Sequence, residues 1–178
     1  MIRHCTFVLL SLALLLAGES AVAQQAKANT APGTEFVQQT FSAKFPQAPE
    51  VTRETLPNSS HVRTSFSYTG PTLMLMVVVL DMGKEGSTTQ QTNALDGGTR
   101  NLLQKMDGLI LSPEGVTQIT LRGHPGRRMY GTLKGAGIFS KSFATSRFVF
   151  LVEAMSAPSD DAARKAAEAF VDSFDLKI

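Results

Sequence analysis

The stretch from Val116 to Met155 constrains the fold of this chain most, because it holds four strand-like runs in succession. The runs are rich in β-branched and aromatic residues, and residues 122–126, 134–137 and 145–146 separate them. The last run, Arg147–Met155, is apolar on both alternating faces. A strand of that kind is covered on both sides, so we expect it at the centre of a sheet.

Further strands are predicted ahead of this stretch. Leu73–Leu80 is a second continuous apolar run, short enough to be a buried strand. Shorter runs at Phe36–Phe45, Val51–Leu56 and Val62–Tyr68 are bounded by proline, glycine or other turn residues, and they predict outer strands.

Two amphipathic segments are expected to cover the sheet. Apolar residues recur at helical spacing in Thr89–Met106 and in Asp160–Phe174, where an aspartate stands at the position of an N-cap. Gly97 and Gly98 interrupt the first segment, and we expect them to pack closely against the sheet; a break that contacts a ligand is the alternative. The order of elements predicts an α+β fold, an antiparallel β-sheet flanked by helices.

Residues 1–23 have the pattern of a signal peptide. A basic residue precedes the apolar run Phe7–Ala17, and small residues then precede a cleavage site after position 23. A membrane anchor is the alternative, but the run is short for a span of about 20 residues. We expect residues 24–35 to be a disordered tether and residues 36–178 to form one exported domain, periplasmic or secreted, with no transmembrane segment after cleavage.

Charge and cysteine content limit the classes of partner and of site that are expected. Loss of the signal peptide removes one of 17 basic and one of 15 acidic residues, so the net charge stays at 16 − 14 = +2. This balance gives no support to a nucleic-acid partner. Cys5 is the only cysteine and leaves with the signal peptide, so neither a disulfide nor a cysteine ligand is expected.

Three motifs follow one another along the chain: FSAKFPQAP at Phe41–Pro49, LRGHPGRR at Leu121–Arg128 and FVDSFDL at Phe170–Leu176. In this order they resemble signature stretches of the Mog1/PsbP-like superfamily, in particular its small exported bacterial domains of unknown function. The resemblance implies an α-β-α sandwich and a role in binding partners.

Four basic residues and a tyrosine around one predicted hairpin are the candidate partner-binding site. These residues are Arg122, Arg127, Arg128, Tyr130 and Lys134. One interpretation is a charged sheet edge that discourages pairing with other sheets. The other is a docking patch, because arginine beside tyrosine is a composition that interfaces favour.

No catalytic, cofactor or metal site is predicted. His124 stands in a Gly-His-Pro-Gly connection that is more typical of a turn, and no Gly-x-Ser-x-Gly motif is present. We therefore expect an exported, non-enzymatic binding or accessory domain whose partner is an envelope or secreted protein. An envelope hydrolase and a small-ligand carrier remain alternatives; the carrier would need an apolar cavity between helix and sheet. The sequence leaves the partner and the oligomeric state open.

Overall fold

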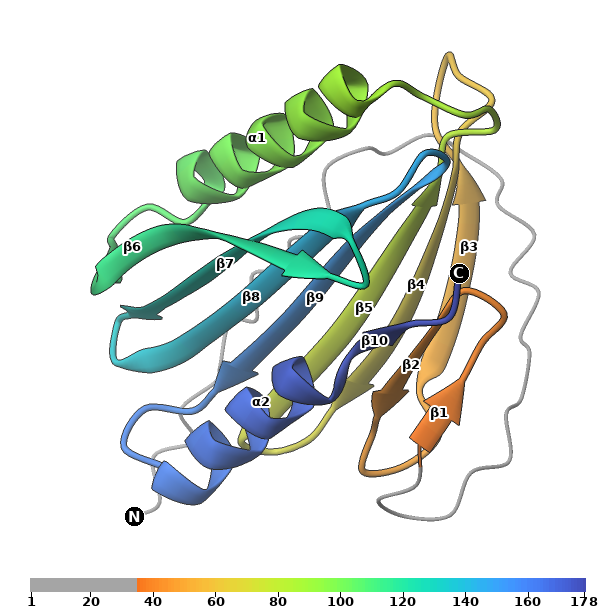
Figure 1. Ribbon diagram of the computed structural model, residues 1–178. Helices are drawn as coiled ribbons and strands as arrows, with labels where there is room; N and C mark the ends of the chain where they lie inside the picture. Colours follow the sequence, from red (N-terminus) through yellow and green to blue (C-terminus); the bar gives the residue numbers. More distant parts are fainter. Residues whose placement is uncertain (1–34) are drawn as a thin grey trace.

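The computed structural model describes residues 35–178, which form ten strands and two helices (Figure 1). The elements are β1 (Glu35–Val37), β2 (Phe41–Lys44), β3 (Glu50–Thr55), β4 (Val62–Thr69), β5 (Leu73–Asp81), α1 (Thr88–Lys105), β6 (Leu109–Leu121), β7 (His124–Leu133), β8 (Ala136–Ala144), β9 (Phe148–Ser156), α2 (Asp161–Ser173) and β10 (Asp175–Leu176). The predicted signal peptide and all of the predicted tether except Glu35 lie outside the described residues.

Seven strands form one antiparallel sheet in the order β3-β4-β5-β9-β8-β7-β6. The prediction that the run ending at Met155 is a central strand is confirmed, since β9 lies fourth of the seven. Two-residue turns join β6 to β7 and β7 to β8, and both residues of each turn have positive φ, as in Arg122–Gly123. His124 is consequently the first residue of β7 and not a turn residue.

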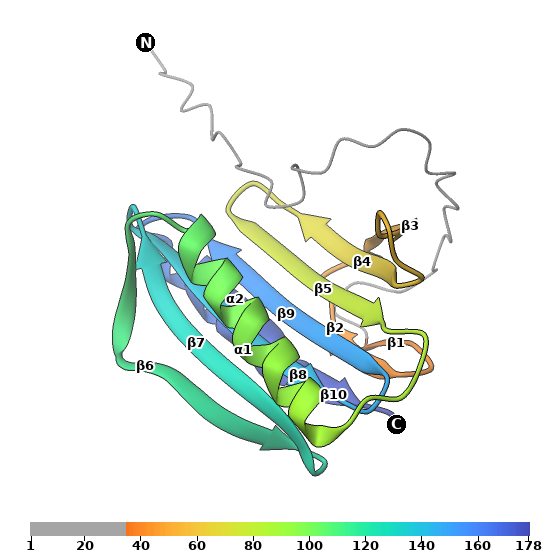
Figure 2. The same cartoon turned by 90° about the horizontal axis from the view of Figure 1, so that it is seen from above.

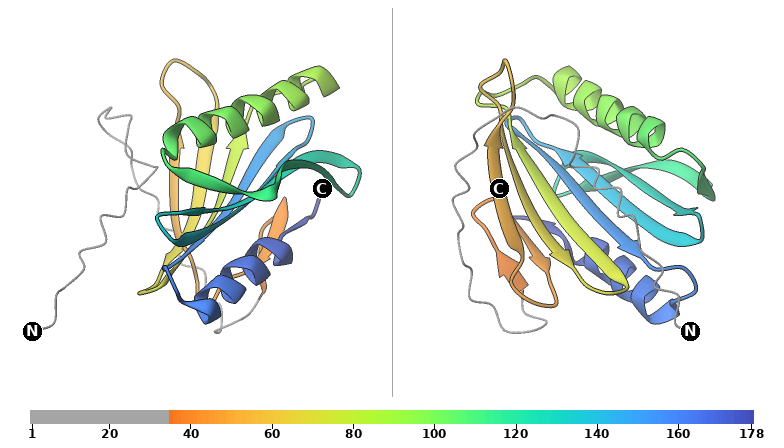
Figure 3. Two further views of the ribbon diagram at one scale, coloured as in Figure 1. Left: turned by 90° about the vertical axis from the view of Figure 1, so that its left-hand side faces the viewer. Right: turned by 180° about the vertical axis from the view of Figure 1, so that it is seen from behind.

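One face of this sheet, the α2 face, carries the larger part of the core. Helix α2 packs on β9, β5 and β8, and a three-stranded sheet of order β1-β2-β10 lies beside it (Figure 3). Phenylalanine rings fill the layer: Phe41 lies 5.1 Å from Phe66 and 5.7 Å from Phe174 between ring centroids. The predicted N-cap is confirmed, because the Asp160 carboxylate accepts a hydrogen bond from the backbone N–H of Ala163.

The opposite face, the α1 face, is covered less completely. Helix α1 begins at a capping box of Ser87 and Gln90, and it buries Leu95 and Leu102 against β7, β8 and β9. Figure 2 looks onto this face: α1 crosses over β7 and β8, whereas β3, β4 and β5 lie to one side of the helix. A strip of apolar side chains on β5 and β9 is therefore left half-buried on the α1 face.

The predicted fold class is wrong. Strands hold 51% of the described residues and helices 22%, so the chain is mostly β, with antiparallel sheets of seven and three strands and not an α+β sandwich flanked by helices. The α-β-α sandwich implied by the family resemblance is corrected with it. The physical reason is that segments 35–37 and 175–176 pair with β2 into a second sheet, which takes part of the face expected for helices. In addition, residues 109–115 extend β6 well beyond the predicted run.

Candidate functional site

Strand β7 divides the predicted basic patch between the two faces of the sheet. Arg127 and Arg128 are consecutive strand residues, so their side chains leave on opposite sides. On the α1 face, Arg127 Nε and Nη2 donate to Asp96 Oδ1 at 3.1 and 2.7 Å. On the α2 face, Arg128 Nη2 donates to Glu114 at 2.8 Å, and its guanidinium lies 5.3 Å from the centre of the Tyr130 ring.

The remaining residues of the predicted patch lie at the two ends of β7. Arg122 precedes the strand and makes a two-bonded ion pair with Asp175, at 2.8 and 2.6 Å. Lys134 follows the strand in the turn to β8. Tyr130 is half-buried against Phe139, and this burial raises the pKa of its hydroxyl. The five residues therefore form no single surface, and each of the three arginines already has a carboxylate partner.

A pocket of about 320 Å³ lies between α1 and the sheet beneath it, and we refer to it as the α1 pocket. Helix α1 contributes Ala94, Leu95, Gly98, Thr99, Asn101 and Leu102. The strands and their connections contribute Leu56, Arg63, Val78, Leu80, Val116, Arg127, Met129, Ser140, Ser142, Val149 and Leu151. Most of these side chains are apolar, so the pocket suits a molecule with an apolar body.

Strand register arranges the floor of the α1 pocket in rows. One row across β5, β9, β8 and β7 consists of Val78, Leu151, Ser142 and Arg127. The next row consists of Met76, Glu153, Ser140 and Met129. Because side chains in line on one face of a sheet lie about 5 Å apart, Glu153 adjoins Ser140, which lines the pocket.

Glu153 is the one charged residue in the buried set of the described chain. Its side chain is 6% exposed, and Oε1 has no hydrogen-bond partner among the described residues. Burial away from water disfavours the charged carboxylate and raises the pKa of Glu153 from 4.5 to about 7. Buried acids without a partner are rare and costly, so this residue calls for a functional explanation.

The two arginines of the α1 pocket are neutralised by their own neighbours. Arg63 forms an ion pair with Glu54 on the adjacent strand β3. Arg127 is only 13% exposed and is paired with Asp96, which ties α1 to β7. The pocket therefore presents no uncompensated positive charge.

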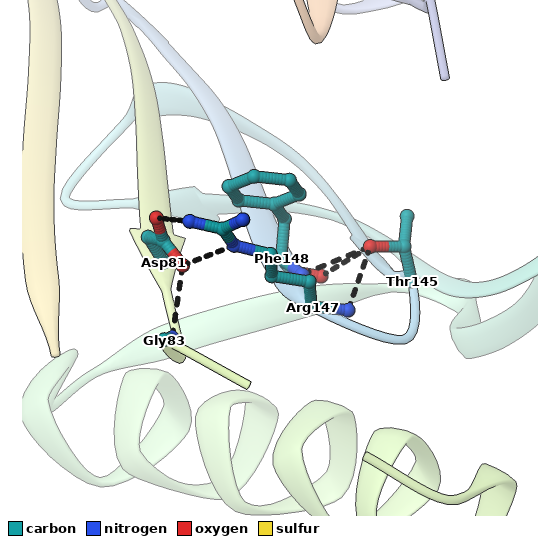
Figure 4. Close-up of polar contacts among 5 residues, drawn as sticks. All are labelled: Asp81, Gly83, Thr145, Arg147 and Phe148. Carbon is teal, nitrogen blue, oxygen red and sulfur yellow. Dashed lines mark hydrogen bonds and ion pairs between the residues drawn. The ribbon is translucent and has the colours of Figure 1, made fainter. Parts of the chain in front are cut away.

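A polar cluster secures the loop that leads into α1 (Figure 4). Arg147 donates to both carboxylate oxygens of Asp81 at 2.9 and 2.8 Å, and this hydrogen bonding is the main reason that the pKa of Asp81 is lowered. The same carboxylate accepts from the backbone N–H of Gly83 at 2.9 Å, and Thr145 Oγ1 accepts from that of Phe148 at 2.9 Å. The cluster joins the end of β5 to the β8–β9 turn and so fixes where the α1 loop starts.

Sequence reasoning missed both the α1 pocket and Glu153. The signal for Glu153 was present, because it is the only charged residue in the apolar run Phe148–Met155. The expectation that Gly97 and Gly98 pack closely on the sheet is wrong, since a Cβ at either position would meet no atom within 4 Å. Gly98 instead lines the pocket.

Comparisons with known proteins leave the site to be interpreted from its geometry. The sequence matches no protein-family model and no curated protein. Within residues 35–178, no three His, Cys, Asp or Glu side chains are grouped to hold a metal ion. Neither helix of that part of the chain is long and apolar enough to cross a bilayer.

Proposed function

We propose that this protein is a non-enzymatic binding domain that holds a small, largely apolar molecule in the α1 pocket. The observation that carries the proposal is the pocket itself, which lies between helix and sheet and is lined mostly by apolar side chains. Its volume of about 320 Å³ is at the lower end of the range for small-molecule sites. This function corresponds to the small-ligand carrier, one of the alternatives that the sequence leaves open.

The half-buried strip beside α1 supports the same proposal. Val78, Leu80 and Leu151 remain partly in contact with water although they lie on central strands. Removing such apolar surface from water is favourable by roughly 25 cal/mol per Å², so a ligand that covers these side chains gains binding energy.

A hydrolase is less well supported. A serine nucleophile needs a general base within hydrogen-bond reach. Ser140 and Ser142 line the α1 pocket, but neither His61 nor His124 is among its lining residues.

Protein docking through the basic hairpin stays a prediction from sequence. The resemblance to the Mog1/PsbP-like superfamily and the stacking of Arg128 on Tyr130 favour it. Arg128→Glu is a sharper test than a change at Arg127, because Arg127 also holds α1 through Asp96. Loss of a captured envelope protein from the Arg128→Glu variant would support docking; unchanged capture would remove this surface from consideration.

A pair of adjacent glycines allows a matched test of the α1 pocket. Gly98→Leu places an apolar side chain in the pocket, whereas Gly97→Leu alters the same helix outside it, and a Cβ at either position meets open space. We expect residues 35–178 to bind an apolar fluorescent dye such as N-phenylnaphthylamine. The Gly98→Leu variant should bind it at least ten-fold more weakly, about 1.4 kcal/mol, and Gly97→Leu should bind normally. Equal affinity of the two variants would contradict the proposal.

A further inference from the structure

We propose that the α1 pocket selects an apolar molecule that carries a basic amine, and that the carboxylate of Glu153 is the counter-charge for that amine. This inference rests on the proposed function, and it adds the chemical class of the ligand. Three features of the α1 face support it: the place of Glu153 in the sheet, its missing partner, and the balance of charge around the pocket.

The place of Glu153 is fixed by strand register. Glu153 pairs with Ser140 on one side and with Met76 on the other. Along its own strand it follows Leu151 by two residues, so both side chains leave the same face. Ser140 and Leu151 line the pocket, and Glu153 is the next residue beyond both of them on this face, so its buried carboxyl group lies directly beside the lining without being part of it.

The missing partner gives this carboxyl group a capacity to bind. Oε1 is buried and accepts no hydrogen bond within the described residues, and the side chain is 6% exposed. An ammonium group would supply both a donor and the opposite charge, and such charge-assisted hydrogen bonds are about twice as strong as neutral ones. A ligand amine thus satisfies a group that the fold leaves unsatisfied.

The balance of charge favours a cation over an anion. Arg63 and Arg127 are the basic residues that line the pocket, and they are paired with Glu54 and Asp96. Every residue that α1 contributes to the lining is uncharged. An ionised Glu153 therefore adds one unpaired negative charge beside the pocket, which disfavours a carboxylate and favours an amine.

A matched series of decyl compounds tests the ligand class at about pH 8, where both amine and Glu153 favour their charged forms. Displacement of the dye by decylamine, decanol and decanoate is measured for the wild type, for Glu153→Gln, and for Glu168→Gln on α2 as a control. The wild type and the control should bind decylamine at least ten-fold more tightly than decanol, and decanoate most weakly. Glu153→Gln should lose the preference for the amine but keep its affinity for decanol.

The outcomes separate this inference from the proposed function. Equal binding of decylamine and decanol by the wild type, or an amine preference that survives in Glu153→Gln, would overturn the amine inference and leave the pocket proposal standing. Binding of none of the compounds, including the dye, would overturn both.

A measurement on the wild type alone covers the case in which Glu153→Gln fails to fold. The preference for decylamine should disappear as the pH falls from about 8 to about 5, because Glu153 takes up a proton over that range. The other charged groups at the pocket form two ion pairs, Arg63 with Glu54 and Arg127 with Asp96. A preference independent of pH would overturn the inference.

Discussion

The buried carboxyl group of Glu153 lowers the stability of the folded chain, although it is the group proposed to bind a ligand amine. Burial raises the pKa of its carboxyl group to about 7, so the folded chain favours the protonated form. In the unfolded chain the group titrates near 4.5. Below about pH 4.5, burial of this residue therefore does not lower the free energy of unfolding. As the pH rises from about 4.5 to about 7, the free energy of unfolding decreases, and it stays lower at higher pH.

The first prediction concerns the pH dependence of stability. A shift from 4.5 to about 7 corresponds to roughly 1.36 × 2.5, or about 3 kcal/mol, as an upper value. We expect Glu153→Gln to unfold at higher urea concentration than the wild type at about pH 8, with a smaller difference at about pH 5. Urea denaturation at the two pH values provides the measurement. Parallel pH profiles for the two proteins would contradict the pKa assigned to Glu153.

Of the two helices, α1 is the one that substitutions should stabilise most. Gly97 and Gly98 lie in its interior, where glycine is less favourable than alanine by about 1 kcal/mol. A Cβ would meet no atom within 4 Å at either position, so the substitution introduces no clash.

The second prediction follows from that open space. Gly97→Ala and Gly98→Ala should each raise the free energy of unfolding by up to about 1 kcal/mol, measured by urea denaturation. Gly126→Ala is the contrasting control, because its Cβ would lie 2.5 Å from the carbonyl oxygen of Ser142. That substitution should destabilise the fold. A loss of stability at Gly97 would indicate that the helix needs the glycine for a contact that the structure does not contain.

Periodicity predicted the single elements better than their assembly. Thr89–Met106 was expected as a helix and α1 spans Thr88–Lys105; Leu73–Leu80 was expected as a strand and β5 spans Leu73–Asp81. Local patterns fix such elements because side-chain spacing decides which face is buried. Phe36–Phe45 is predicted as one strand, but the chain turns within it and forms β1 and β2, which pair with each other. The two-residue strand β10 is not predicted, because it is defined only by its pairing with β2.

The candidate site was hidden from sequence for a related reason. The α1 pocket arises because α1 lies over β7 and β8 and leaves part of β5 and β9 uncovered, and no spacing along one segment encodes that offset. The predicted basic patch shows the reverse case, in which residues that are close in sequence do not share one surface. The alternation of β7 directs Arg127 and Arg128 to different faces of the sheet, where each pairs with its own carboxylate.

At the scale of the whole molecule, the small sheet joins the two ends of the described chain. Strand β2 lies between β1 and β10, and the backbone N–H of Lys177 donates to the carbonyl of Thr40 at 3.0 Å. Leu176 on β10 is completely buried in the phenylalanine-rich core, whereas Ile178, two residues later, is 46% exposed. The last few residues thus close the core on the α2 face.

The third prediction tests this closure by comparing two apolar residues of the same terminus. Leu176→Ala should lower the free energy of unfolding by about 2–5 kcal/mol, because it removes buried methyl groups and leaves a cavity. Ile178→Ala should change stability by no more than about 0.5 kcal/mol, because its side chain is already largely in water. Urea denaturation of both variants gives the comparison. Equal effects would mean that the C-terminal strand is not part of the cooperative fold, and the domain would then have to be stable on the seven-stranded sheet and its helices alone.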